Sequence, residues 1–267
     1  MANASINLGN GNWSVKESKL LGSRPIKDKI APIEFDVTRA STATRVNKQG
    51  LIETVNSNIA RIDYSSDAKG ALLLEPQSTN LITYSEDFID SSWVKENVTV
   101  QSNTETSPDG FLNASYVIPN IGSGLTPRIN YGFSSQSGVT YQSSIFVKKF
   151  NIDWIRVLST GATGNTIQAY YDISNGVIGT SDNSELATIE DYGNGWYRLG
   201  LKIVSTNTSS GATFRVQFAG GDGNPIITTD GTEKFICWGA QLEENSYATS
   251  YIPTLTGTTQ TRVAETC

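Results

Sequence analysis

The sequence contains no histidine and very few sulfur-containing residues. The absence of histidine excludes Ser-His-Asp and Cys-His catalytic arrangements, His-containing zinc sites and most general-base chemistry near neutral pH. Apart from the first residue, sulfur occurs only at Cys237 and Cys267. Cys237 lies in the apolar run FICWG and is expected to be a small buried thiol. We therefore predict no disulfide framework.

Long apolar runs are also missing. No stretch approaches the roughly 20 apolar residues of a membrane-spanning helix. The start MANASINLGNGNW lacks the basic n-region and the apolar h-region of a secretory signal peptide. We therefore expect no membrane partner and no signal-peptide export.

Negative charge is in excess, and it is unevenly distributed. The formal net charge is −6; residues 1–82 hold ten Lys/Arg and eight Asp/Glu, whereas residues 83–267 hold ten and eighteen. Nucleic-acid binding needs clustered cations that neutralise phosphates. The only adjacent basic pair in the acidic part is Lys148-Lys149. This distribution argues against a nucleic-acid partner.

From about residue 83 the apolar residues recur with a period of two. Such runs are rich in β-branched and aromatic residues and are separated by turn signals such as SPDG and GGDGNP. No helix of three turns is predicted. The pattern predicts an all-β fold, a jelly-roll β-sandwich of two antiparallel sheets. Four clear runs are TIQAYYDIS (166–174), RLGLKIV (198–204), TFRVQFAG (213–220) and FICWGAQLE (235–243).

The sequence suggests four parts. The polar, glycine-rich residues 1–32 are interpreted as an extended N-terminal arm or attachment segment, and residues 33–82 as a lead-in that packs on the sandwich. Residues 83–253 are assigned to the jelly roll. The polar residues 254–267 are interpreted as a C-terminal linker, after which the chain is expected to continue into another domain.

Six separated motifs carry a resemblance to a known family. Their order resembles that of bacteriophage head-spike or head-fibre virion proteins, which are similar to tail-fibre proteins, over residues 35–265. The resemblance implies a jelly roll of the carbohydrate-binding-module type. The motifs are RASTATRVNKQGLIE (39–53), NIARIDY (58–64), LLLEPQSTNLITYSEDF (72–88), GNGWYRL (193–199), CWGAQLEENSYATSYIPT (237–254) and TRVAE (261–265).

The resemblance also implies a role. It suggests a structural fibre or spike on the virion surface that binds host-surface or environmental glycans weakly and in many copies. The arm would contact other virion proteins, and a homotrimer is expected because such fibres are commonly trimeric. One alternative is a purely architectural capsid decoration protein without glycan binding. A carbohydrate-active hydrolase is a further alternative, but no recognisable catalytic carboxylate pair supports an enzyme.

Aromatic and amide side chains on polar strand faces are the candidate glycan site. Aromatic faces stack on sugar rings, while amides and guanidinium groups bond the hydroxyls. The alternative is an ordinary solvated sheet face. The predicted residues are Tyr170, Gln168, Arg215, Gln217, Tyr131 and Trp154, of which Tyr170 and Tyr131 are expected to be the most exposed.

Two further sites are weaker. The resemblance implies a structural calcium between the first and last strands, for which Glu86 and Asp87, with Glu243, occupy comparable places. Calcium takes six to eight oxygens, more than these side chains supply. In the lead-in, Arg39 is expected to bond nearby carboxylates or backbone carbonyls, because its planar guanidinium suits both.

Overall fold

The computed structural model describes the chain except for residues 1–4, 7–13, 17–18 and 27–28. Every regular element in the described residues is a β-strand, and none of them is a helix that could cross a membrane. The chain forms two compact units. Unit 1 contains Met1–Thr79, Thr249–Ile252 and Thr261–Cys267, and unit 2 contains Asn80–Ala248 and Pro253–Gln260.

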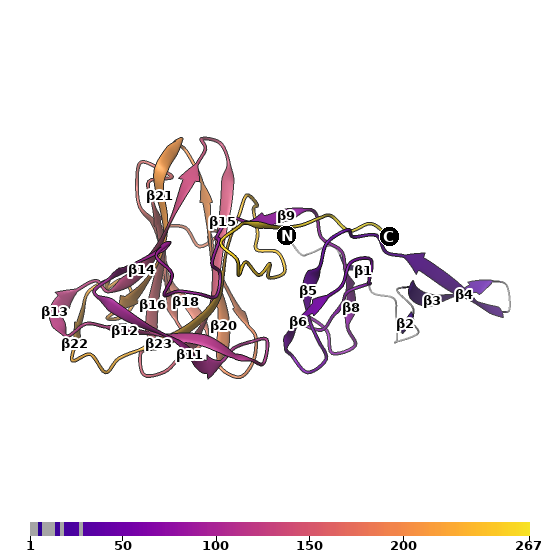
Figure 1. The fold of residues 1–267 in the computed structure, drawn as a ribbon, viewed down its shortest axis with the longest axis horizontal. Helices are drawn as coiled ribbons and strands as arrows, with labels where there is room; N and C mark the ends of the chain where they lie inside the picture. Colours follow the sequence, from indigo (N-terminus) through magenta and orange to yellow (C-terminus); the bar gives the residue numbers. More distant parts are fainter. Residues whose placement is uncertain (1–4, 7–13, 17–18, 27–28) are drawn as a thin grey trace. The chain divides into compact units, whose positions relative to one another are not determined.

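Unit 2 is a sandwich of two antiparallel six-stranded sheets (Figure 1). Sheet I has the order β10 (Trp93–Glu96), β14 (Arg128–Ser135), β21 (Ser209–Ala219), β16 (Trp154–Thr160), β17 (Ile167–Asp172) and β18 (Val177–Ser181). Sheet II has the order β11 (Val98–Thr106), β12 (Leu112–Pro119), β23 (Phe235–Glu243), β15 (Thr140–Lys149), β20 (Trp196–Val204) and β19 (Ala187–Asp191). A short pair, β13 (Gly122–Leu125) and β22 (Ile227–Thr229), completes the unit.

The alternation in the sequence explains this arrangement. Successive side chains of a strand point to opposite faces, so every second residue of β21 enters the space between the sheets. In β23 the alternation is shifted once by a bulge, with Phe235 and Cys237 before it and Ala240 and Leu242 after it in the core. Phe214, Val216 and Phe218 from sheet I meet Phe235 and Cys237 from sheet II in one apolar core. The predicted all-β jelly-roll sandwich of two antiparallel sheets is confirmed.

Unit 1 is built from short strands. They form β1 (Ser5–Ile6), β8 (Ala71–Leu73) and β7 (Ile62–Asp63); β2 (Ser14–Lys16), β3 (Lys19–Ile26) and β4 (Lys29–Asp36); β5 (Ala43–Val46) and β6 (Ile52–Val55); and β9 (Ser78–Asn80) with β24 (Gln260–Arg262). The predicted arm at 1–32 lies partly outside the described residues, and its described parts belong to β1–β4. Its attachment role stays a prediction.

Five buried charged side chains form an ion cluster in unit 1. Glu265 accepts hydrogen bonds from Arg39 and from Arg61, whose Nε lies 2.8 Å from Glu265 Oε1. Glu75 Oε2 lies 2.9 Å from Arg61 Nη2 and 3.1 Å from Arg262 Nη1. The side chains of all five are at most 1% exposed. Each ion therefore relies on protein partners instead of water.

Backbone carbonyls accept further hydrogen bonds from the arginines. Arg39 donates to the carbonyls of Ser41 and Asn56 at 2.8 and 2.6 Å, as its fork geometry favours. This agrees with the expectation for Arg39, except that its carboxylate partner is Glu265, which is 226 positions away. The cluster ties the lead-in of the chain to its last residues.

The C-terminal segment differs from the predicted linker at 254–267. Gln260–Arg262 forms β24, which pairs with β9, and this yellow segment runs beside β9 in Figure 1. Arg262 is 1% exposed, and Glu265 bonds two arginines. The prediction failed because charged residues in an aperiodic segment are normally solvated. Here their charged partners are buried and lie far away in the sequence. Residues 261–267 are thus part of unit 1, whereas Pro253–Gln260 belongs to unit 2.

Candidate functional site

The outer face of sheet I, which points away from the apolar core, carries a continuous row of polar side chains. Residues paired directly across antiparallel strands project to the same side. The pairing places Glu96 beside Arg128, Arg128 beside Gln217, Gln217 beside Arg156 and Arg156 beside Tyr170. We call these five residues the polar row. The row crosses β10, β14, β21, β16 and β17.

A second row lies two residues further along each strand. Asn130 pairs with Arg215, Arg215 with Leu158, and Leu158 with Gln168. The predicted residues Gln168, Arg215 and their partners in the polar row therefore share one face. Their grouping follows from the period of two, which puts Gln168 with Tyr170 and Arg215 with Gln217.

Hydrogen bonds connect the two rows. Arg156 donates from Nε to Oε1 of Gln168 at 2.6 Å and from Nη1 to Oε1 of Gln217 at 3.4 Å. Its guanidinium carbon lies 5.7 Å from the ring centre of Tyr170, within the range of a cation–π contact. Gln217 in turn donates from Nε2 to the carbonyl of Pro225 at 2.8 Å. These side chains are thus held in defined positions.

The exposure of the row differs from the prediction. Tyr170 is 3% exposed and Gln217 is 2% exposed, although both were expected to face solvent. The guanidinium of Arg156 over the ring, and the contact of Gln217 with Pro225, account for this. Burial raises the pKa of Tyr170, against the opposing effect of Arg156. Arg215, Gln168 and Trp154 remain partly exposed and are the accessible members of the predicted set.

The prediction placed Tyr131 on the wrong face of the sheet. Its ring lies in the apolar core, 5.1 Å from the ring centre of Trp93, and is 7% exposed. Its hydroxyl accepts a hydrogen bond from the Thr83 amide at 3.0 Å. Because Asn130 points outward, its neighbour must point inward. The prediction grouped Tyr131 with polar residues that are adjacent in sequence but opposite in the sheet.

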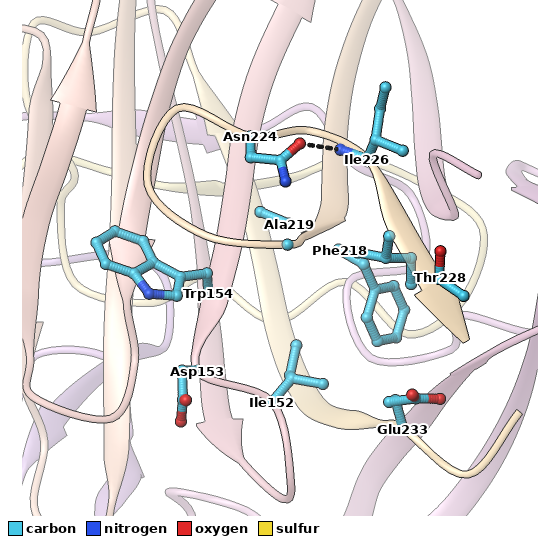
Figure 2. Close-up of a pocket in the computed structure, with 11 residues that line it drawn as sticks. Ile152, Asp153, Trp154, Phe218, Ala219, Asn224, Ile226, Thr228 and Glu233 are labelled. Carbon is cyan, nitrogen blue, oxygen red and sulfur yellow. Dashed lines mark hydrogen bonds between the residues drawn. The ribbon is translucent and has the colours of Figure 1, made fainter. Parts of the chain in front are cut away.

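Trp154 lies on the outer face and also lines a pocket of about 640 Å³ at one end of the sandwich. Figure 2 shows the indole on one side of the hollow, with Ile226 and Thr228 on the other and Asp153 and Glu233 along one edge. A Cβ on Gly179 would lie 2.6 Å from the indole, so this position requires glycine. The pocket combines apolar walls with a few polar groups, as small-molecule sites commonly do.

Both carboxylates of the pocket are engaged by protein groups. Asp153 lies 2.5 Å from the Nζ of Lys149, and Glu233 accepts a hydrogen bond from the Thr229 hydroxyl. These contacts hold both side chains in place at the edge of the pocket.

The predicted calcium ligands do not gather. Glu86 accepts from the Asn113 amide at 3.1 Å, Asp87 is exposed, and Glu243 is fully buried. Across the described residues, no group of three or more His, Cys, Asp or Glu side chains could hold a metal. Calcium also takes backbone oxygens, so the ion stays a prediction from the resemblance.

Sequence reasoning missed four polar residues of the outer face. Glu96, Arg128, Asn130 and Arg156 lie in the two rows, but they were not included in the candidate set. Alternation within each strand indicated that they share a side with Gln217 or Arg215 only once the strand order was known. The missing signal was the pairing of β14 and β16 with β21, which a single sequence does not reveal.

No protein-family model and no curated protein matches the chain. Similar solved structures include a beta-sandwich superfamily carbohydrate-binding module (11% identity, covering 91% of this chain and 98% of that chain, TM-score 0.40). The enzymatically active domain of bacteriophage CBA120 tailspike protein 4 gives 11% identity over 61% of this chain, with a TM-score of 0.38. The Clostridium thermocellum xylanase 10B CBM22-1–GH10 modules, complexed with xylohexaose, give 16% identity over 67%, with a TM-score of 0.38.

The chain spans only part of two of these structures, 21% of the tailspike domain and 30% of the xylanase modules. All three similarities are too distant to assign a function. The candidate site therefore depends on the geometry of the outer face and the adjoining pocket.

Proposed function

We propose that unit 2 is a carbohydrate-binding module whose site is the outer face of sheet I together with the adjoining pocket. The observation that carries this proposal is the polar row, which runs across five strands and ends near an accessible tryptophan. Amide and guanidinium groups match sugar hydroxyls, and the Trp154 indole offers a stacking surface. Gln168 and Arg215 are the accessible polar contacts of this site.

We further propose that the protein is a fibre or spike component on a phage virion. The order of the motifs supports this role, and charged residues of four motifs (Arg39, Arg61, Glu75 and the pair in TRVAE) meet in the ion cluster of unit 1. Other virion proteins would be its partners, and a homotrimer is the expected assembly. Many copies on one particle raise avidity by orders of magnitude, so a weak site suffices.

The glycan site is tested by binding of the full chain, multimerised on a fluorescent carrier, to a glycan array. Trp154→Ala is expected to weaken binding by about tenfold, which corresponds to about 1.4 kcal/mol. Phe150→Ala is the matched control, because Phe150 is an exposed aromatic outside the outer face of sheet I. A folded protein that binds no glycan would favour the architectural decoration protein without glycan binding.

The assembly is tested by light scattering on the full chain across a concentration series. A mass of three chains supports the fibre role. A monomer at all concentrations contradicts the trimer and removes the avidity argument, while leaving the glycan site itself intact.

A further inference from the structure

Three arginines lie together on the outer face of sheet I. Arg128 and Arg156 flank Gln217 in the polar row, and Arg215 lies in the second row, beside Asn130. The chain as a whole has a net charge of −6, so this grouping differs in sign from the average of the molecule.

Two of these arginines are not paired with carboxylates. Arg128 is ion-paired with Glu96, but Arg156 donates hydrogen bonds to two neutral side-chain amides. Arg215 donates from Nε to the hydroxyl of Thr213 at 2.8 Å. Among the described residues, neither Arg156 nor Arg215 forms an ion pair. Their positive charge is therefore available to a ligand.

The neighbouring carboxylates have other partners. Glu96 accepts from the Asn130 amide at 2.5 Å as well as from Arg128. Asp182 accepts from the backbone amide of Gln168 at 2.9 Å, and Asp222 from that of Thr180 at 2.6 Å. Asp182 and Asp222 bind backbone at the β17–β18 side of the sheet. They balance the charge of the region without neutralising either guanidinium directly.

The positive charges of the arginines also repel one another, which disfavours the charged form of each side chain. Burial lowers the pKa of Arg215, and the charges of Arg128 and Arg156 lower the pKa further, against Glu96. Burial likewise lowers the pKa of Arg156. One donor of this face, Arg128 Nε, is buried without a hydrogen-bond partner. The face therefore holds guanidinium charges that repel one another, and an anionic ligand would reduce this repulsion.

We infer that the glycan bound by this face is acidic, with an oxyanion held between Arg156 and Arg215. A guanidinium group bonds carboxylate, sulfate and phosphate through two parallel hydrogen bonds, so the shared chemistry is a planar or tetrahedral oxyanion on a sugar. The neutral part of the sugar would lie toward Trp154, which lines the pocket. This inference rests on the proposed carbohydrate-binding function and names its ligand class.

The experiment measures binding of the full chain to glycans that differ only in charge. One pair is polygalacturonate and its methyl ester, and a second pair is a sulfated glycan and its desulfated form. Arg215→Gln and Arg156→Gln remove one charge each from the face. Lys202→Gln removes the same charge from β20 in sheet II and is the matched control. Unchanged melting temperatures confirm that the variants are folded.

We expect at least one acidic member to bind more tightly than its neutral partner. Each arginine variant is expected to lose roughly tenfold to a hundredfold in affinity, the equivalent of one charged hydrogen bond, while the lysine control keeps it. Because the net charge is negative, non-specific attraction does not favour acidic glycans. The stronger pair identifies whether carboxylate or sulfate is preferred.

Other outcomes separate the two hypotheses. Equal binding of charged and neutral partners, unaffected by the arginine variants, would overturn the acidic ligand and leave the carbohydrate-binding function standing. Binding of neutral glycans only would have the same meaning. A folded chain that binds none of the four glycans and nothing on the wider array would overturn both.

Discussion

Unit 1 and unit 2 are both made of strands, but they are held together by different interactions. The apolar cluster described in unit 1 consists of Val37, Ala60, Ile62 and Leu72, next to an ion cluster of five buried charges. Unit 2 has a continuous apolar core between two large sheets. The same chain thus uses long-range ion pairs where strands are short, and apolar burial where sheets are wide.

This difference has a consequence for tolerance to substitution. An apolar core accepts replacements of similar volume, usually for less than about 1.5 kcal/mol, because its contacts are non-directional. Buried ions are less forgiving, since removing one partner leaves an uncompensated charge and costs about 3–5 kcal/mol. Unit 1 should therefore depend on a few particular residues, and unit 2 on total apolar volume.

The largest expected effect comes from Glu265→Ala. This substitution leaves Arg39 without its carboxylate and removes one of the two carboxylates that bond Arg61. We expect unit 1 to lose about 3–5 kcal/mol of its free energy of unfolding. Hydrogen exchange should rise in the peptides that cover 43–55 and 60–73, while the peptides of sheets I and II keep their protection.

Two variants serve as controls for this prediction. Thr266→Ala changes the adjacent exposed side chain and should leave exchange unaltered. Phe214→Ala removes a fully buried ring from unit 2 and should cost about 3–5 kcal/mol there. If Glu265→Ala left exchange in unit 1 unchanged, the ion cluster would not be what stabilises this unit.

The second effect is a pH dependence that distinguishes the two units. Burial alone would raise the pKa of Glu75, but Arg262, Arg61 and bonds from Ser250 outweigh it, so the pKa lies below its ordinary value of 4.5. A depressed pKa in the folded state stabilises the protein above the unfolded pKa, and this stabilisation is lost as the pH falls. Below pH 4.5, unit 1 should therefore lose exchange protection.

Unit 2 also buries the charged residues Arg198 and Glu243, but its two sheets enclose a large apolar core that does not titrate and should retain protection in the same range. Exchange measured at several pH values between neutral and acidic tests this difference. Simultaneous loss of protection in both units would show that Glu75 does not control the stability of unit 1.

The sequence predicted much of unit 2 and little of unit 1, for a physical reason. In β17 and β21, side-chain direction follows from a local period of two, so both the strands and the shared face of Gln168 and Arg215 could be predicted. The prediction for Tyr131 was wrong because the alternation of side chains along the strand was not applied to it. By contrast, Arg39 and Glu265 are 226 positions apart. No local pattern indicates such a contact.

The position of the candidate site shows the same limit. Alternation assigned each residue to a face, but the proximity of Arg128, Arg156 and Arg215 depends on the order of β14, β21 and β16, which are far apart in the chain. The pocket beside Trp154 depends on a loop around Asn224 as well. Strand order and loop conformation depend on long-range contacts, and the local patterns of a single sequence do not reveal them.

The smallest expected effect comes from Arg45→Ala, which sharpens the comparison within one motif. Arg45 and Glu53 face each other across β5 and β6, with Nε 2.7 Å from Oε1, and their side chains are 25% and 37% exposed. Water and salt screen such a pair, so its loss should cost about 0.2–1 kcal/mol. Arg39→Ala, six residues earlier, should cost several times more. Chemical denaturation followed by hydrogen exchange compares the two, and equal costs would contradict the view that burial of the ion cluster decides the stability of unit 1.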